Sequence, residues 1–431
     1  MQESIAAIAT ASGTGGVAII RISGENSLEI AGKMFTPYKN FKPNYMYAGH
    51  IQADGFTDYG FLVYFKAPKS FTGEDVVELH CHGGVQLARG VLKKCLSLGA
   101  RLADRGEFTK RAFLNGKLTL ASAEGMADMI NAESLALLRA GSMLYGEKLS
   151  NEVETLQNSL KDILAEVAVE IDYPEEDDGG LDLKKIKSQV AALKVATDGL
   201  VSGYKCGKKL KEGVTVAICG KPNTGKSSLL NALLGYDKAI VSAEAGTTRD
   251  AVEGAIDIDG VKYNLIDTAG IRECAGAVES IGIERAKKIV TTADIILSVS
   301  EGEDADLPAD VSGEVIRVFN KSDLKKPVGK FDIAVSAKTG NGLDKLKKLI
   351  AEISFGDIAL DKAYVVEERH YAALLKAAKA LKSATENLET LTLDIIAVDL
   401  KDAWDALGEI TGETANEEII STVFSKFCVG K

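Results

Sequence analysis

Apolar and polar residues recur with two different periods along the chain, and the change of period divides the chain into parts. Short apolar runs rich in Val and Ile are found between residues 211 and 357. Runs of this kind are typical of buried strands. We expect such strands at residues 214–219, 261–266, 315–319 and 331–335. Residues 226–234 and 342–353 have helical spacing, so the pattern predicts an α/β domain over 211–357.

The region 1–118 mixes both periods. Its pattern predicts strands at residues 16–23, 60–66 and 76–81, and helices at residues 27–35 and 85–98. We therefore expect an N-terminal α+β domain, although this pattern alone names no ligand.

Helical spacing dominates the rest of the chain, residues 119–210 and 358–431, where Leu, Ala and Ile recur at intervals of three and four. The acidic segment 172–180 interrupts this spacing; we interpret it as a solvated connection, with a metal or partner role as the alternative. A compact domain has its termini close together, so it can be inserted into a host domain without unfolding it. We therefore predict one discontinuous helical domain, 119–210 plus 358–431, with 211–357 inserted.

Composition and charge narrow the possible functions. The net charge of −11 argues against a generally cationic nucleic-acid binder, so any RNA contact must use a local basic patch. The six cysteines are scattered without a Cys-x-x-Cys pair, which favours reduced thiols in a cytoplasm over a disulfide framework. No apolar run approaches the ~20 residues that span a bilayer, and no basic and apolar signal segment is found at the N-terminus.

One motif joins the first predicted strand of the α/β domain to a helix. Residues 220–227 have the pattern G-x-x-x-x-G-K-S of a phosphate-binding loop. Gly220 and Gly225 allow successive backbone N–H groups to point into one concavity. Lys226 is then expected to reach the β- and γ-phosphates and Ser227 to bind Mg²⁺, while the helix presents its positive end to the phosphates.

Three further motifs follow in the order that a GTPase requires. Asp267 follows a predicted strand and can hold the Mg²⁺ shell, and the N–H of Gly270 can sense the γ-phosphate. In Asn320-Lys-Ser-Asp323 the carboxylate can accept both the ring N1–H and the exocyclic amine of guanine. Adenine lacks this donor pair, and such a mismatch can discriminate by roughly 10⁴-fold. Ser336-Ala337-Lys338 resembles the loop that closes over the base, so the four motifs together indicate a GTP-binding domain.

The residue after Gly270 bears on the hydrolysis step. Many GTPases place there a Gln that orients the attacking water, but this chain has Ile271, which forms no side-chain hydrogen bond. Water activation must come from elsewhere, and the nearby acids Glu273 and Glu279 are candidates, with a solvent-facing role as the alternative for either. Segment 245–250 is similar to switch I, where Thr248 can complete the Mg²⁺ sphere. Asn223 offers an oxygen to a monovalent cation, which would supply charge that other GTPases take from an arginine.

His80 and His82 lie two residues apart on one predicted strand and so face the same side. Because no third or fourth ligand is evident, we predict a packed or hydrogen-bonded role rather than a metal site.

These motifs and their order resemble a known family, the tRNA-modifying GTPases called MnmE or TrmE. The matching segments, besides the phosphate loop with Asn223, are Phe71-Thr-Gly-Glu-Asp-Val-Val-Glu-Leu79, Gly106-Glu-Phe-Thr-Lys-Arg-Ala-Phe-Leu-Asn-Gly-Lys117, Gly246-Thr-Thr-Arg-Asp250, Asp267-Thr-Ala-Gly-Ile-Arg-Glu273 and Phe427-Cys-Val-Gly-Lys431. The likeness runs essentially the whole length. The family usually has Ile where Val429 stands, a difference of one methylene.

The resemblance implies a specific activity. Together with an FAD-dependent partner, MnmG, the family adds a carboxymethylaminomethyl or aminomethyl group to C5 of the wobble uridine of certain tRNAs. Its N-terminal domain dimerises and binds 5-formyltetrahydrofolate or a related one-carbon donor. By motif position the expected folate contacts are Arg21, Glu78, Lys117 and Lys431.

The resemblance also implies roles inside the GTP-binding domain, whose pairing across a dimer requires potassium in the family. Potassium ligands are expected at Asn223, Ser242, Glu244 and Thr247, and Mg²⁺ ligands at Ser227 and Thr248. Glu279 would orient the attacking water, and Cys428 would serve tRNA modification, with apolar packing as the alternative for this cysteine. The full set of expected nucleotide contacts is Asn223, Thr224, Gly225, Lys226, Ser227, Ser228, Ser242, Ala243, Glu244, Ala245, Gly246, Thr247, Thr248, Asp267, Thr268, Ala269, Gly270, Asn320, Lys321, Asp323, Ser336, Ala337 and Lys338.

Two other classes of function compete with this interpretation. A ribosome-assembly GTPase would share the GTP-binding domain, but it has no use for the folate-like segment or the terminal Cys-Val-Gly-Lys. A folate-dependent one-carbon transferase with a regulatory G domain would make the modified uridine without MnmG. Binding of formyltetrahydrofolate distinguishes the tRNA-modifying GTPase from the ribosome-assembly GTPase. A requirement for MnmG distinguishes it from the one-carbon transferase.

Overall fold

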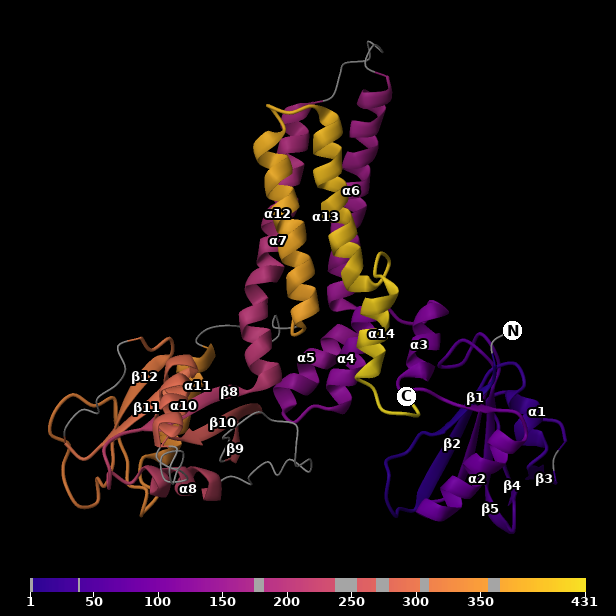
Figure 1. Cartoon of the computed structure of the whole chain (residues 1–431), viewed down its shortest axis with the longest axis horizontal. Helices are drawn as coiled ribbons and strands as arrows, with labels where there is room; N and C mark the ends of the chain where they lie inside the picture. Colours follow the sequence, from indigo (N-terminus) through magenta and orange to yellow (C-terminus); the bar gives the residue numbers. More distant parts are fainter. Residues whose placement is uncertain are drawn as a thin grey trace. The chain divides into compact units, whose positions relative to one another are not determined.

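The computed structural model describes residues 3–37, 39–173, 182–236, 254–268, 279–302, 310–355 and 365–431 (Figure 1). Within it the chain forms two compact units. The first comprises residues 1–127, 144–191 and 379–431, and the second comprises residues 128–143 and 192–378. Each unit contains a sheet and helical segments, and each is described by itself.

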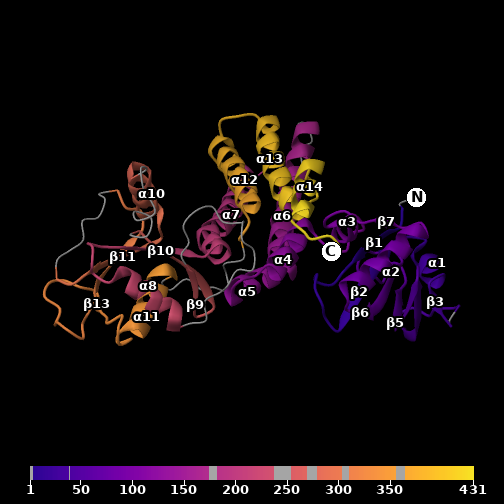
Figure 2. The ribbon, with the colours of Figure 1, turned by 60° about the horizontal axis from the view of Figure 1, so that its bottom comes forward.

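The first unit contains a seven-stranded sheet with the order β3-β4-β5-β6-β2-β1-β7 (Figure 2). Its strands are antiparallel to their neighbours except that β1 and β7 are parallel. The strands are β1 (Ile5–Ile8), β2 (Val17–Ser23), β3 (Phe35–Thr36), β4 (Met46–Ala53), β5 (Phe56–Phe65), β6 (Val76–His82) and β7 (Arg101–Leu102). The predicted strands at 16–23, 60–66 and 76–81 thus match β2, β5 and β6, whereas β1, β3, β4 and β7 were not anticipated.

The two faces of this sheet differ because alternate residues of a strand point to opposite sides. Helices α1 (Ser27–Gly32) and α2 (Val85–Ser97) cover one face, where Ile20, Ile22 and Leu79 are fully buried in the main core cluster. On the other face a smaller cluster joins Ala7 of β1 to Phe108 of α3 (Glu107–Leu114). The predicted helix 27–35 is therefore too long, because the chain leaves the helix after Gly32 and Phe35 begins β3.

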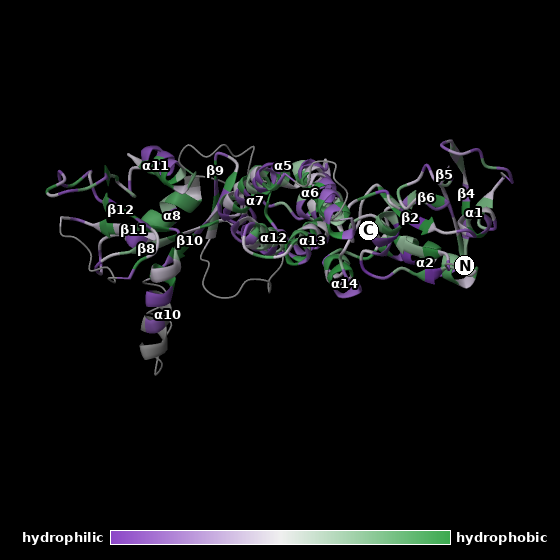
Figure 3. Cartoon of the chain, turned by 90° about the horizontal axis from the view of Figure 1, so that it is seen from above, coloured by the Kyte–Doolittle hydropathy of each residue, from purple (hydrophilic) through white to green (hydrophobic). Residues whose placement is uncertain are grey.

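Long helices flank the inserted segment in the sequence. They are α4 (Leu120–Ile130), α5 (Leu135–Tyr145), α6 (Lys148–Asp172), α7 (Leu183–Glu212), α12 (Glu368–Asn387), α13 (Leu393–Thr411) and α14 (Glu417–Ser425). Within the first unit α6 packs along α13, and the buried amide of Gln157 donates to the backbone oxygen of Trp404 at 3.3 Å. Figure 3 shows that α6 and α13 carry both hydrophobic and hydrophilic residues, and in α6 the buried Val153, Leu156 and Leu160 recur at intervals of three and four, as in amphipathic helices. The helical domain is therefore discontinuous in sequence, as predicted.

The second unit contains a six-stranded sheet with the order β13-β12-β11-β8-β10-β9. Its neighbours are parallel except for β9, which is antiparallel to β10. The strands are β8 (Val214–Cys219), β9 (Gly254–Ile258), β10 (Val261–Asp267), β11 (Ile295–Ser300), β12 (Glu314–Phe319) and β13 (Ile333–Ala334), and the helices of this fold are α8 (Lys226–Tyr236), α10 (Glu279–Thr292) and α11 (Leu343–Phe355). This is the predicted α/β domain. Strand β11 is an addition to the predicted strands, and all six of its residues are buried.

No helix in the described part of the chain is both long and apolar enough to cross a bilayer. The cysteines that the structure describes, Cys81, Cys95, Cys206, Cys219 and Cys428, are all free thiols, and only Cys428 is exposed.

Candidate functional site

The phosphate loop lies between the carboxyl end of β8 and the start of α8, where an open parallel sheet places its ligands. Gly220 and Gly225 have φ angles of 153° and 86°, which strain residues with a side chain. A Cβ on Gly220 would lie 2.1 Å from the backbone oxygen of Val299, and one on Gly225 would lie 2.4 Å from Nδ2 of Asn320. Both positions therefore require glycine for backbone shape and for space.

The two polar residues that open α8 are already oriented. Lys226 is buried, and its Nζ donates to the backbone oxygen of Lys221 at 2.9 Å, so the ammonium is held over the loop. The Ser227 hydroxyl donates to Oδ2 of Asp267 at 2.8 Å. Because β8 and β10 are parallel neighbours, the two expected members of the Mg²⁺ shell meet at one edge of the sheet.

The base-recognition motif is tied to the phosphate loop. The Asn320 side chain donates to the backbone oxygen of Thr224 at 3.0 Å and accepts from the N–H of Ala337 at 3.2 Å. Lys321 donates to the backbone oxygen of Asn223 at 2.9 Å and also contacts Glu301. Asn320 thus links the phosphate loop and the base loop into one preorganised site.

Asp323 is the residue expected to read the base. It is exposed, and one carboxylate oxygen accepts the hydroxyl of buried Ser336 at 2.6 Å. This hydrogen bond lowers the pKa of Asp323 below its usual value, and the cations of Lys338 and Lys321 act in the same direction. The carboxylate is therefore ionised at neutral pH and able to accept two donors.

Part of the predicted nucleotide site lies outside the described residues. This holds for the switch I and potassium positions Ser242, Ala243, Glu244, Ala245, Gly246, Thr247 and Thr248, for Ala269 and Gly270, and for Ile271 and Glu273. Glu279 is the first residue of α10, but its side chain is likewise outside the described part.

A second group of predicted site residues lies on the sheet of the first unit, on the face opposite to α1 and α2. Arg21 on β2 and Glu78 on β6 are direct neighbours in the antiparallel register. Nε of Arg21 donates to Oε1 of Glu78 at 2.9 Å, and Nε2 of His80 lies 3.3 Å from Oε2. Burial raises the pKa of the Glu78 carboxyl, but the hydrogen bonds and charges of His80 and Arg21 outweigh it, so the net pKa is lowered.

Two aromatic rings flank the Arg21 guanidinium. The rings of Phe71 and Phe108 have centroids 5.7 Å from its central carbon, within the range of cation–π contacts. Both rings lie inside the two N-terminal segments that carry the resemblance, but neither is among the predicted site residues. Sequence position alone gives no sign that both rings converge on Arg21.

The C-terminal tail lies against the same sheet. Val429 forms an antiparallel bridge with Arg105, whose Nε donates to the backbone oxygen of Phe427 at 3.0 Å. A Cβ on Gly430 would lie 2.2 Å from the backbone oxygen of Ile8 in β1, which is the strand next to that of Arg21. The tail thus places Cys428 near the carboxyl end of β1, and this cysteine is exposed. Its exposure contradicts the alternative that Cys428 packs in an apolar core.

The remaining N-terminal residues are less closely joined. Lys431 follows Gly430 on the tail and is half-buried, and Lys117 is exposed just after α3. Nδ1 of His82 lies 2.7 Å from Oδ1 of Asp58, and the backbone N–H of His82 donates to Oδ2 at 2.9 Å. Both histidines of the His80–His82 pair are therefore hydrogen-bonded to carboxylates.

Comparison with known proteins covers the whole chain. A family model described as "MnmE helical domain" matches residues 120–428, and one described as "GTP-binding protein TrmE N-terminus" matches residues 4–117. The "tRNA modification GTPase MnmE" of Natranaerobius thermophilus is 38% identical over 456 residues, covering 100% of both chains. The protein of the same name from Ligilactobacillus salivarius is 39% identical over 456 residues, covering 100% of this chain and 98% of the relative.

Among solved structures, the G domain of the T. maritima FeoB iron transporter is 28% identical and covers 33% of this chain and 98% of its own, with a TM-score of 0.25.

Proposed function

The chain belongs to the MnmE family of tRNA modification GTPases, and from this we propose that it hydrolyses GTP while taking part in modification of the wobble uridine of tRNA. In this proposal it acts with the FAD-dependent partner MnmG and adds a carboxymethylaminomethyl or aminomethyl group at C5. The reaction takes place in the cytoplasm, where the scattered cysteines remain reduced.

The organisation of the nucleotide site supports the GTPase activity. Lys226 would neutralise phosphate charge, and Asp323 would accept the two donors of guanine. Mg²⁺ is a hard cation that prefers oxygen ligands. The side-chain oxygens of Ser227 and Asp267 lie within hydrogen-bonding distance of each other, so both would reach one ion. That ion would neutralise the charge that develops on the phosphate oxygens. Potassium would be held by four residues, Asn223, Ser242, Glu244 and Thr247. Glu279 would orient the attacking water.

The Arg21–Glu78 pair supports a folate site. A carboxylate suits the adjacent N–H donors of a pterin ring, and the cations of Arg21, Lys117 and Lys431 suit the glutamate tail of 5-formyltetrahydrofolate. Glu78 is mostly buried yet ionised, so it can accept donors in a partly water-excluded place. We assign these four residues to the folate contacts.

An exposed aromatic patch supports a homodimer through the N-terminal domain. Met46 of β4 and Tyr59 and Phe61 of β5 lie on one face of the sheet and are between 40% and 56% exposed. Apolar side chains of this size grouped on one surface are typical of an interface. A Tyr59→Glu chain is expected to sediment with a lower mass than the unsubstituted chain.

The single observation that carries the proposal is the position of the tail. The tail brings a cysteine to the sheet that bears Arg21 and Glu78. The function of a ribosome-assembly GTPase would not require a cysteine at this sheet. We propose that Cys428 acts in tRNA modification, that residues 119–210 and 358–431 form the helical domain, and that residues 1–118 and 211–357 form the folate and GTP domains.

The test is the wobble-nucleoside profile of tRNA from cells that lack this protein. We expect loss of the C5 modification, its return with the native gene, and no return with Cys428→Ser. In vitro, GTP hydrolysis should be faster in potassium than in sodium. An unchanged nucleoside profile would refute the role in modification, and modification without MnmG would favour the one-carbon transferase.

A further inference from the structure

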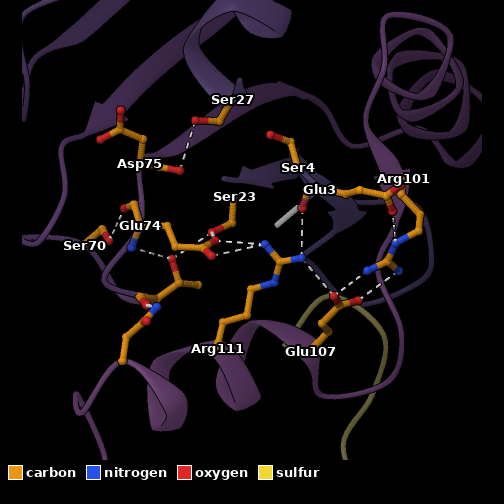
Figure 4. Close-up of polar contacts among 12 residues, drawn as sticks. Glu3, Ser4, Ser23, Ser27, Ser70, Glu74, Asp75, Arg101, Glu107 and Arg111 are labelled. Atoms are coloured by element: carbon orange, nitrogen blue, oxygen red, sulfur yellow. Dashed lines mark hydrogen bonds and ion pairs between the residues drawn. The ribbon is translucent and has the colours of Figure 1, made fainter. Parts of the chain in front are cut away.

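A network of charged side chains joins α3 to the loop that precedes β6 (Figure 4). Arg111 of α3 lies at its centre and is 6% exposed. Its Nη1 donates to both carboxylate oxygens of Glu74, at 3.3 and 3.0 Å. Its Nη2 donates to Oε1 of Glu107 at 3.0 Å and to the backbone oxygen of Glu3 at 2.9 Å. Arg111 therefore fixes three segments at once.

The Glu74 side of the network reaches the strand of Arg21. Oε2 of Glu74 accepts the hydroxyl of Ser23 at 2.7 Å, and that hydroxyl lies 2.7 Å from the hydroxyl of Thr72. Ser23 is two residues beyond Arg21 on β2, so both side chains point to the same face of the sheet. The carboxylate is thus fixed to the surface on which Arg21 lies.

Each of the two segments that form the Arg111–Glu74 ion pair also supplies one of the rings that flank Arg21. Phe108 precedes Arg111 by three residues on α3, and Phe71 precedes Glu74 by three residues in the loop. Both ring centroids are 5.7 Å from the guanidinium carbon of Arg21. The Arg111–Glu74 pair therefore joins the two segments that hold the guanidinium between aromatic faces.

This arrangement matters for ligand binding because an arginine side chain has several rotatable bonds, and ordering it costs free energy when the ligand binds. Rings on two sides and Glu78 at Nε leave Arg21 only a narrow range of directions. A ligand then meets a guanidinium and a carboxylate that are already oriented.

We propose that Arg111 is a positioning residue for the folate site: through Glu74 and its own helix it holds Phe71 and Phe108 on Arg21. This inference rests on the proposed binding of folate at Arg21 and Glu78. Arginine is needed because one side chain donates in two directions, to Glu74 and to Glu107. A lysine can neutralise Glu74 but cannot reproduce both sets of bonds.

The experiment is calorimetric titration of the full chain with 5-formyltetrahydrofolate. Arg111→Gln is expected to weaken binding by about tenfold or more, and Arg111→Lys by less. The matched control is Arg101→Gln, because Arg101 binds the outer side of the same network, at Glu107, and does not contact Glu74. The control should bind within about twofold of the unsubstituted chain, and circular dichroism reports the folded fraction of each variant.

A double-mutant cycle separates positioning from general loss of stability. Phe71→Ala should weaken binding in the unsubstituted chain but cause little further loss in the Arg111→Gln chain, where Phe71 is already displaced. Equal losses in both backgrounds would overturn the proposal. If Arg111→Gln does not fold, the same cycle is run on Arg111→Lys or on the Glu74→Gln/Arg111→Gln pair, which leaves no uncompensated charge at this position.

The failure of this inference is distinct from failure of the proposed function. If the unsubstituted chain does not bind 5-formyltetrahydrofolate, the folate site itself is wrong. If the chain binds it, Glu78→Ala loses it and Arg111→Gln binds normally, the folate site stands and Arg111 has no positioning role.

Discussion

The nucleotide site takes its groups from loops at the carboxyl ends of parallel strands, whereas the Arg21–Glu78 site takes them from the middle of two antiparallel strands. In the phosphate loop the groups expected to meet a phosphate are backbone N–H groups, and the positive φ angles of Gly220 and Gly225 allow the loop its shape. On the sheet face the groups are side chains, placed by strand register and by neighbouring rings. The comparison shows that one chain can preorganise ligand groups through backbone shape in one region and through side-chain packing in another.

This difference predicts what each site tolerates. A loop of backbone donors is disrupted by an added Cβ, while a site of paired side chains is disrupted by the removal of a charge. The largest effects are expected from the removal of a charge, at Asp323 and at Glu78, and smaller ones from an added Cβ at Gly225 and from a lowered pH.

Asp323→Asn removes the carboxylate that accepts the two guanine donors. We expect the preference for GTP over xanthosine triphosphate to fall by roughly 10⁴-fold, because the amide offers one acceptor and one donor. Competition binding measures the ratio. Asp332→Asn is the control: it makes the same chemical change in the same domain, at a residue that accepts the backbone N–H of Arg317. A preference that survives in Asp323→Asn would remove the base-reading role.

Glu78→Gln should weaken 5-formyltetrahydrofolate binding by about 10- to 100-fold, because hydrogen bonds to a charged group contribute about 1.5–3 kcal/mol. Titration calorimetry provides the measurement. Glu29→Gln is the control, since Glu29 is exposed on α1 and pairs with Lys33. Equal affinity in the Glu78 and Glu29 variants would mean that the carboxylate does not face the ligand.

Gly225→Ala places a Cβ 2.4 Å from the Asn320 amide at a φ of 86°. Strain of about 1–3 kcal/mol should reduce GTP affinity by about tenfold or more. In Gly235→Ala the Cβ meets no atom of the described residues within 4 Å and the position is helical, so this control should bind GTP normally and be slightly more stable. Similar GTP affinities in both variants would contradict the backbone argument.

The smallest effect is a pH dependence of stability. Burial raises the pKa of Glu107, but hydrogen bonds from Arg101, the Asp104 N–H and Arg111 outweigh it, so the pKa lies below its ordinary value of 4.5. A lowered pKa contributes stability above 4.5 that is lost as the pH falls through the folded value. Denaturant unfolding should therefore show a loss of stability below about pH 4.5, and Glu107→Gln should make the decline shallower. A decline of equal slope in both chains would assign it to other carboxylates.

The sequence predicted the two sites unequally for the same physical reason. The phosphate loop and the Asn320–Asp323 motif are contiguous, so residue type and spacing were sufficient to place them at strand ends. Arg21 and Glu78 are 57 residues apart and meet only because β2 and β6 pair in one register, which periodicity cannot supply. The resemblance named both residues, but their contact, the flanking rings and the role of Arg111 required coordinates. Strands as short as β3 and β7 carry too few residues for a period to be seen.

The packing of α6 on α13 has a consequence for biosynthesis. Gln157 and the Trp404 oxygen that it contacts are 247 residues apart in sequence. At a translation rate of about 5–20 residues per second, the ribosome needs about 12–50 seconds between these two residues. During that interval the inserted GTP domain can complete its own sheet, while the apolar side of α6 waits without its partner.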